Sequence, residues 1–173
     1  MNRPRPGSTT GIFPGAGGRG GAIFPCMSST TPPSEAPAQA ASIAAPGGCL
    51  CGQIRYRIIG EPIATTYCHC RSCRLASGAP AVAWVVIAGD GLVIERGEPV
   101  AFRSSPDVER TFCGRCGTSL TYRKDHHSTI DVHTATLDDP DRFAPTREIW
   151  LEDKLAWMVS NDQMEHYPRS SRG

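Results

Sequence analysis

The cysteines place the strongest limit on what this chain can fold into. Seven of the eight stand in three short clusters, which read CLC (Cys49, Cys51), CHCRSC (Cys68, Cys70, Cys73) and CGRC (Cys113, Cys116). Pro and Gly interrupt the N-terminus where the apolar core of an export signal would lie, so we expect a cytoplasmic protein whose thiols stay reduced. Metal binding is therefore favoured over a disulfide framework.

The spacing within the clusters suits a shared metal ion. In CGRCG, the two glycines let the backbone fold tightly around an ion that both thiolates bind, as in a zinc knuckle. In an extended C-x-C segment, side chains two residues apart point to the same face and can reach one ion together. The alternatives are buried apolar thiols, iron–sulfur ligation, and a redox-active pair, which would need a βαβ context.

The number of cysteines separates two kinds of site. Two closed tetrahedral sites need eight ligands, and the three clusters supply seven. Pairing CLC with CGRC completes one four-cysteine structural site between distant parts of the chain. The remaining cysteines then bind a second ion with a vacant position, as catalytic zinc does: Cys68, Cys70 and Cys73. We therefore predict two Zn²⁺ ions per chain.

Several side chains are alternatives for that vacant position. Cys26 is tethered by a flexible segment, and closing a loop of about 40 residues costs on the order of 3 kcal/mol. His69 lies between two ligands, but alternation points it away from the ion if the backbone is extended. His126, His127 and His133 are further options, although KDHHS is typical of a solvated hairpin turn.

The chain is expected to divide near residue 45. Residues 1–45 are rich in Pro, Gly, Ser, Thr and Ala, and they bury too little apolar surface to offset their ordering entropy, so we predict disorder there. Residues 46–168 are predicted to form one zinc-binding β domain. Met27 opens a more usual N-terminal sequence, so by hypothesis residues 1–26 are an upstream extension or a start-site error.

The remaining sequence has a mainly β pattern. QIRYRII (53–59) alternates apolar and basic residues like a half-exposed strand, whereas VAWVVIA (82–88) is continuously apolar like a buried one. Further short runs follow between Gly, Pro and Asp turns. Helix is expected only for a turn or two after Cys70 and in a short piece around Asp153 to Val159.

Charge and hydropathy argue against two classes of partner. Residues 46–173 carry 15 basic and 16 acidic side chains, a net charge of −1, which is unlike a basic nucleic-acid-binding domain. No run of eighteen apolar residues is present, so we expect no membrane span. A small molecule is the expected partner.

The order of the clusters resembles one protein family. The segments GGCLCGQIRY, YCHCRSCRLASGAP and RTFCGRCGTSL, and later TIDVHTATLDDPDRFAPTREIW, are similar to the glutathione-dependent formaldehyde-activating enzymes, a family that also includes centromere protein V. The resemblance runs from about Gly47 to Trp157. It implies a β-tent fold, a structural zinc on the cysteines of CLC and CGRC, and a catalytic zinc on Cys68, Cys70 and Cys73.

The resemblance also implies an activity. The family's chemistry is addition of the glutathione thiol to formaldehyde, giving S-(hydroxymethyl)glutathione, or its reversal by a carbon–sulfur lyase. An open zinc ion can hold the thiol as a thiolate or polarise the aldehyde oxygen. Arg71 and Arg74 flank the three-cysteine cluster and are candidates for stabilising it or for binding glutathione carboxylates, with ordinary solvated arginines as the alternative. The alternative function is a non-catalytic zinc module for partner binding.

Overall fold

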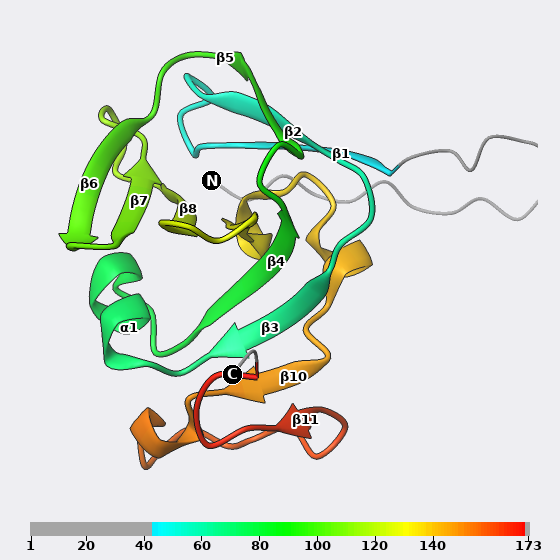
Figure 1. Cartoon of the computed structure of the whole chain (residues 1–173), viewed down its shortest axis with the longest axis vertical. Helices are drawn as coiled ribbons and strands as arrows, with labels where there is room; N and C mark the ends of the chain where they lie inside the picture. The colour runs from blue at the N-terminus through cyan, green and yellow to red at the C-terminus, as the bar shows by residue number, and fades with distance from the viewer. Residues whose placement is uncertain (1–42, 172–173) are drawn as a thin grey trace, which may run out of the picture. The chain divides into compact units, whose positions relative to one another are not determined.

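Two β-sheets make up most of the described part of the chain. The structure is a computed structural model and describes residues 43–171. The smaller sheet is antiparallel, in the order β1-β2-β5: β1 (Ala44–Gly48), β2 (Arg55–Ile59) and β5 (Leu92–Arg96). The larger sheet has eight strands in the order β11-β10-β3-β4-β9-β8-β7-β6. Figure 1 shows both sheets.

The larger sheet mixes parallel and antiparallel pairs. Its strands, in sheet order, are β11 (Glu165–His166), β10 (Arg147–Ile149), β3 (Ala64–Cys68), β4 (Val82–Ala88), β9 (Thr129–His133), β8 (Ser119–Lys124), β7 (Val108–Phe112) and β6 (Val100–Ser105). β10 runs parallel to β3 and β11, and the other pairs are antiparallel.

Helical structure in the described residues is short. One α-helix, α1 (Arg71–Ser77), joins β3 to β4. Three 3₁₀ turns lie later in the chain: η1 (Thr134–Thr136), η2 (Pro140–Phe143) and η3 (Leu151–Asp153). The fold is therefore mainly β, as the sequence predicted, and none of the described helices is long and apolar enough to cross a membrane.

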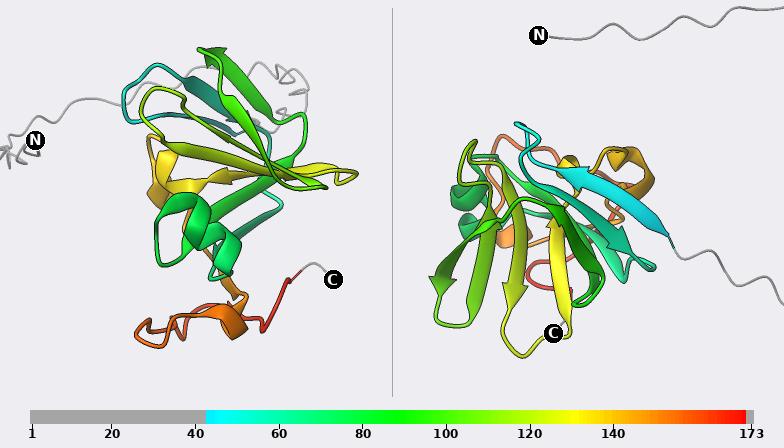
Figure 2. Two further views of the ribbon diagram at one scale, coloured as in Figure 1. Left: turned by 90° about the vertical axis from the view of Figure 1, so that its left-hand side faces the viewer. Right: turned by 90° about the horizontal axis from the view of Figure 1, so that it is seen from above.

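The main core lies between the two sheets. β2 alternates as predicted, and it buries Tyr56 and Ile58 while its arginines stay partly or fully exposed. These two side chains belong to one apolar cluster with Val85, Ile87 and Val132 of the larger sheet. Figure 2 shows the small sheet across one side of the large sheet and α1 on the other side.

β4 is buried on both of its faces, which explains its unbroken apolar sequence. Val85 and Ile87 point into the main core, whereas Val82 and Trp84 join a second apolar cluster with Ile149 of β10. This second cluster also contains Cys68 and Cys73, from β3 and α1. The predicted buried strand is therefore confirmed, and its second face supports the three-cysteine segment.

β1 has an unusual sequence for a strand, AAPGG, and forms because of its neighbours. A side chain at Gly47 would collide with the Tyr56 ring and with the Thr136 carbonyl, at 2.5 and 2.7 Å from an ideal Cβ. Only glycine permits this close approach. The Tyr56 hydroxyl passes beside it to reach Thr136 Oγ1 at 2.7 Å. This contact fixes the end of β1 immediately before Cys49.

The structure differs from the sequence expectations in two segments. The predicted helix around Asp153 to Val159 is wrong, because η3 ends at Asp153 and residues 154–164 contain no helix. Trp157 and Val159 are exposed, so a short helix here would have no buried face to stabilise it. The disorder predicted for residues 1–45 falls outside the described residues up to residue 42, and Ala44 and Ala45 lie in β1.

Candidate metal centres

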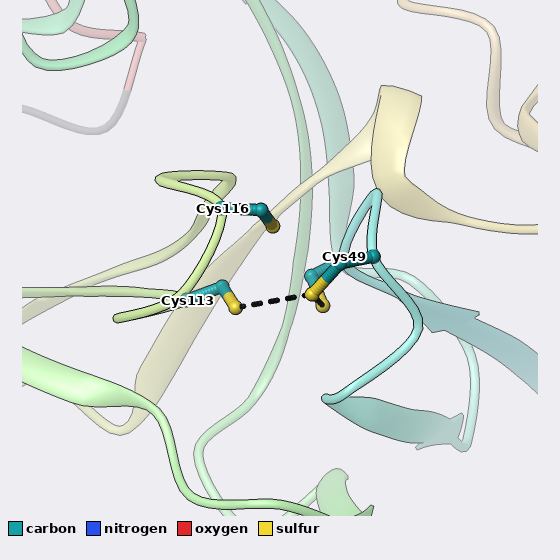
Figure 3. A group of neighbouring side chains, drawn as sticks. Cys49, Cys113 and Cys116 are labelled. Atoms are coloured by element: carbon teal, nitrogen blue, oxygen red, sulfur yellow. Dashed lines mark hydrogen bonds between the residues drawn. The ribbon is translucent and has the colours of Figure 1, made fainter.

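Four of the predicted ligands come together although they are distant in the sequence. Cys49 and Cys51 follow β1, and Cys113 and Cys116 follow β7. Their four sulfur atoms all lie within 4.8 Å of one another. Figure 3 shows the sulfurs of Cys49, Cys113 and Cys116 pointing toward a common centre. We call this group the four-cysteine cluster.

The turns that carry these cysteines are held by local hydrogen bonds. The amide of Ile54 donates to Cys49 Sγ at 3.2 Å. In the other turn, Gly117 has φ +75°, a left-handed conformation that favours glycine, and its amide donates to the Cys113 carbonyl at 2.8 Å. Backbone hydrogen bonds therefore hold both turns, and the CGRCG turn has the tight, glycine-assisted backbone predicted for it.

The sulfur spacing fits a tetrahedral thiolate site. With a zinc–sulfur distance of about 2.3 Å, the edge of such a tetrahedron is about 3.8 Å. Cys51 Sγ lies 3.5 Å from Cys49 Sγ and 3.8 Å from Cys113 Sγ, far beyond a disulfide bond. Hydrogen bonds from Thr118 lower the pKa of Cys116 to about 5, which favours the thiolate that binds metal.

The other three predicted ligands form a compact group in one short segment. Cys68 ends β3, Cys70 caps the N-terminus of α1, and Cys73 lies in the first turn of that helix. Their sulfurs also lie within 4.8 Å of one another. The Cys73 amide donates to Cys70 Sγ at 3.3 Å, so a thiolate takes the capping role that an oxygen usually has. We call this group the three-cysteine cluster.

The three thiols of this cluster are not equivalent. Hydrogen bonds from Cys68 and Cys73 lower the pKa of Cys70 to about 2, and the same interaction with Cys70 raises the pKa of Cys68. The three sulfurs therefore interact closely, and their protonation is linked. A divalent ion that replaces those protons would let all three bind as thiolates.

The surroundings of the two clusters differ. A cleft of about 1220 Å³ is lined by Cys68, Cys70 and Cys73, whereas none of the four-cysteine cluster borders it. The apolar walls of this cleft include Trp84 of the central strand β4, Phe102 of the edge strand β6, and Trp150, which follows β10. The three sulfurs can therefore bind an ion from one side and leave its other side open to a small molecule.

The two arginines predicted to assist this cluster lie in different environments. Arg71 is exposed and lines the cleft, and its amide donates to Asp153 Oδ2 at 3.3 Å. Arg74 does not line the cleft, and its guanidinium donates to the backbone carbonyls of His69 and Asp153 at 3.2 and 3.4 Å. Arg71 therefore lies at the cleft, whereas Arg74 connects α1 to the backbone at His69 and Asp153.

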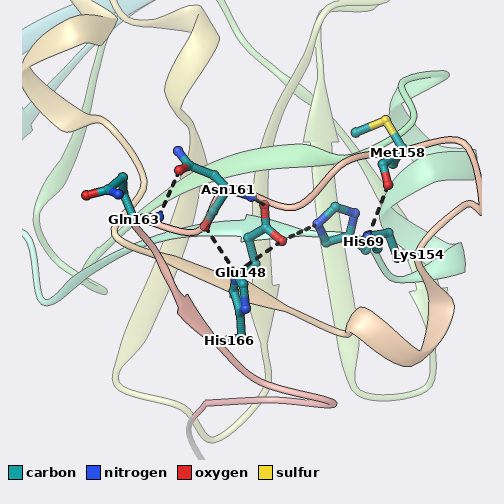
Figure 4. A network of polar contacts seen from close by, with 7 residues as sticks. All are labelled: His69, Glu148, Lys154, Met158, Asn161, Gln163 and His166. Atoms are coloured by element: carbon teal, nitrogen blue, oxygen red, sulfur yellow. Dashed lines mark hydrogen bonds and ion pairs between the residues drawn. The ribbon is translucent and has the colours of Figure 1, made fainter.

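His69 is buried beside the cluster but is not among its ligand atoms. Its Nε2 lies 3.6 Å from Glu148 Oε2, and burial lowers the pKa of the imidazole. Glu148 is itself buried, and its Oε1 accepts a hydrogen bond from the Asn161 amide at 3.1 Å. Figure 4 shows this group, in which the imidazole faces the Glu148 carboxylate. His69, which lies between Cys68 and Cys70, therefore connects this segment to β10 through Glu148.

The remaining candidates for a fourth ligand lie elsewhere or outside the described residues. His126 and His127 occupy the turn between β8 and β9, as the sequence predicted, and His127 lines the cleft. His133 is buried against Trp84, with ring centroids 4.2 Å apart. None of the three belongs to either cysteine group within the described part of the chain. Cys26 lies outside that part.

Sequence reasoning missed Arg110 of β7. This residue is buried, and its Nη2 donates to Cys73 Sγ at 3.7 Å. Its guanidinium carbon lies 4.9 Å from the centre of the Tyr122 ring. Alternation places Arg110 on the same side of β7 as the buried Val108, which was the available signal. The proximity to Cys73 depends on the packing of α1 against the sheet and is not visible in the sequence.

Comparisons with known proteins find one family and two similar proteins. Residues 44–153 match the family described as glutathione-dependent formaldehyde-activating enzyme. The chain is 34% identical over 76 residues to an uncharacterised lyase of Schizosaccharomyces pombe, a match that covers 44% of this chain and 55% of that protein. A crystal structure of a Rhodobacter sphaeroides protein is similar with a TM-score of 0.46 and 21% identity, covering 54% of this chain and 87% of that one.

The family match includes both cysteine clusters. It begins at the first residue of β1 and ends at the last residue of η3, so it contains both turns of the four-cysteine cluster, α1 and most of the cleft. The matched segment is more than half of the 173 residues. This chain belongs to the glutathione-dependent formaldehyde-activating enzyme family.

Proposed function

We propose that this protein is a zinc-dependent lyase of the carbon–sulfur type that acts on a thiol–aldehyde adduct similar to S-(hydroxymethyl)glutathione. The family match and the lyase name of the fission-yeast relative support a lyase. The observation that carries the proposal is the position of the three-cysteine cluster in the wall of a large cleft. The four-cysteine cluster has no such access and suits a structural role.

The proposal assigns one zinc ion to each cluster. The four-cysteine cluster supplies a complete tetrahedron, and Cys68, Cys70 and Cys73 supply three ligands of a second one. Zinc at the second site supplies a position that holds a thiol as its thiolate or withdraws electrons from an oxygen. The unit that carries this activity is residues 46–168.

The side chains around the cluster orient the adduct. Trp84 and Tyr122 offer apolar walls beside the sulfurs, and Arg71 offers a cation for a substrate carboxylate. In the lyase direction, the carbon–sulfur bond breaks and its electron pair goes to sulfur. The adduct hydroxyl loses its proton as the carbonyl forms, and one proton is returned to the sulfur, so the products are a thiol and an aldehyde.

The direct test is exchange between formaldehyde, glutathione and their adduct, followed by NMR. Because the addition also proceeds unaided, the measured quantity is the rate above the protein-free background. We expect wild-type protein with two zinc ions to enhance exchange and Cys70→Ser to lose the enhancement. Arg123→Met, a change on the exposed face of β8, is the matched control and should behave as wild type.

The same experiment addresses the alternative. Fully zinc-loaded protein that gives no enhancement with glutathione, or with cysteine as a smaller thiol, contradicts the proposed lyase activity. That result favours a zinc module whose second ion serves partner binding. Enhancement that persists in Cys70→Ser would place the activity away from the three-cysteine cluster.

A further inference from the structure

Arg110 is a buried cation held from three sides. Its side chain is 6% exposed, although it stands on β7 near an edge of the larger sheet. Nε donates to Ser104 Oγ at 3.3 Å, Nη2 donates to Cys73 Sγ at 3.7 Å, and the guanidinium lies over the Tyr122 ring. These contacts fix the plane of the guanidinium beside the three-cysteine cluster.

No carboxylate of the described residues forms an ion pair with Arg110. Asp131 lines the same cleft, but the strand register places it two strands from Arg110, with Tyr122 between them. Two strand spacings separate the backbones of these two residues by about 10 Å, and the ion pairs of the described residues include none between their side chains. Nη1 is buried and has no hydrogen-bond partner within the described chain. A buried, unpaired charge is costly, so the cation needs a counter-charge close by.

The three-cysteine cluster can provide that counter-charge. Three thiolates around a divalent ion leave one net negative charge, and one guanidinium cancels it. We propose that Arg110 is the counter-cation of the metal-loaded three-cysteine cluster and a positioning residue for Cys73. This inference rests on the assignment of a metal to that cluster in the proposed function, and it names the residue that makes the assignment electrostatically favourable.

The pairing has a consequence for the ligand that enters the cleft. Without the guanidinium, an incoming thiolate would join a site that already carries a negative charge. With Arg110 in place, its guanidinium would offset the negative charge of the metal-loaded cluster, so the repulsion on an incoming thiolate would be smaller. The N–H···S contact also draws electron density from Cys73 and orients its sulfur. Arg110 thereby favours a thiolate ligand over a neutral one.

The first test measures the affinity of the second metal ion. Wild type, Arg110→Met, Arg110→Lys and the control Arg123→Met are titrated with zinc against a chelator, and with Co²⁺ as a coloured probe. We expect Arg110→Met to weaken one of the two sites about ten- to hundredfold and to shift the sulfur-to-cobalt absorption of that site. Arg110→Lys, which keeps the charge, should restore most of the affinity, and Arg123→Met should change neither site.

The second test separates a counter-ion from a packing residue. Arg110→Met is made in wild type and in Cys70→Ser, and the four proteins are compared by thermal melts. If Arg110 is a counter-ion, Arg110→Met should lower the melting temperature clearly in wild type. In Cys70→Ser, where the cluster has lost its charge, the same change should leave the melting temperature unchanged or raise it. Equal destabilisation in both backgrounds would make Arg110 a structural residue and overturn the inference.

The outcomes also distinguish this inference from the proposed function. Wild-type protein that binds a single metal ion contradicts the proposed function itself. Two ions in wild type, with unchanged affinity and unchanged cobalt absorption in folded Arg110→Met, leave the function standing and overturn the role of Arg110.

Discussion

The two cysteine clusters use the same donor atom and differ in what they connect. The four-cysteine cluster joins two turns that are 62 residues apart at Cys51 and Cys113. The three-cysteine cluster lies within Cys68–Cys73 and borders a cleft that the other cluster does not reach. On the proposed function, the clusters differ in role because of their sequence separation and surroundings, since both use the same type of ligand. A metal that closes a long loop stabilises the fold, whereas a metal on a short segment is free to keep an open position.

The largest effect should follow from breaking the long-range cluster. Cys113→Ser removes a buried ligand that ties the turn after β7 to the turn after β1, and it should lower the free energy of unfolding by more than about 5 kcal/mol, comparable to the whole stability of a small domain. Thermal melts followed by circular dichroism measure this. Arg115→Ala, an exposed change in the same turn, is the control, and a Cys113→Ser protein that melts like it would contradict the structural role.

Breaking the local cluster should abolish chemistry and leave the fold. Cys70→Ser releases little long-range constraint, so we expect a folded protein with about one zinc ion and no activity above background. Elemental analysis, melts and the exchange assay measure the three properties. The neighbouring exposed Ser72→Ala should keep both ions. If Cys70→Ser unfolds as completely as Cys113→Ser, the division between the two clusters is not real.

His133, which packs against Trp84 next to the three-cysteine cluster, should make the free energy of unfolding depend on pH. Burial, followed by the nearby Arg110 charge, lowers the pKa of His133 to about 4. In the unfolded chain, His133 takes up a proton near pH 6.5, whereas in the folded protein it does so only near pH 4. The free energy of unfolding is therefore highest above pH 6.5 and falls as the pH is lowered toward 4. The loss at pH 5 is about 2 kcal/mol.

The variant His133→Phe isolates this contribution. It keeps an aromatic ring against Trp84 and removes the titrating group. Acid also weakens zinc binding, but that effect is common to both proteins, so the difference between them from pH 7 to pH 5 is the relevant measurement. A wild type that loses no more stability than His133→Phe over that range would show that His133 is protonated without cost in the folded state.

The smallest expected effect concerns the remaining cysteine. Cys26→Ser should change neither the zinc content nor the melting temperature, because the proposal leaves the fourth position of the three-cysteine cluster to a small molecule. Zinc counting and a melt suffice to check this. Loss of one zinc ion in this variant would mean that both clusters are closed four-cysteine sites, which would contradict the proposed open position in the three-cysteine cluster.

The sequence predicted those features that depend on spacing and alternation. The two metal groups followed from counting ligands, and β4 followed from its unbroken apolar run, because it is buried on both faces. β1 was not predicted, since AAPGG has no strand propensity and forms a strand only where Gly47 admits the Tyr56 ring. Such tertiary contacts override local preference.

Within the candidate site, the grouping of the cysteines was predictable from the sequence, and the contacts of the cysteines with other side chains were not. Alternation could place Arg110 on the inner side of β7, but its contact with Cys73 depends on how α1 packs beside that strand. Arg74 is close to the ligands in sequence, yet helix geometry directs it to the His69 carbonyl. Proximity along the chain therefore did not predict which arginine contacts a sulfur of the cluster.

The three-cysteine cluster lies within the loop that the four-cysteine cluster closes, so the two clusters become complete at different times during synthesis. Cys68, Cys70 and Cys73 lie between Cys51 and Cys113, so the three-cysteine segment leaves the ribosome complete while the other cluster still lacks half its ligands. At about 5–20 residues per second, Cys116 follows Cys73 several seconds later. The nascent chain therefore exposes Cys68, Cys70 and Cys73 to metal ions and oxidants first. The four-cysteine cluster, which joins distant parts of the folded domain, can form only later.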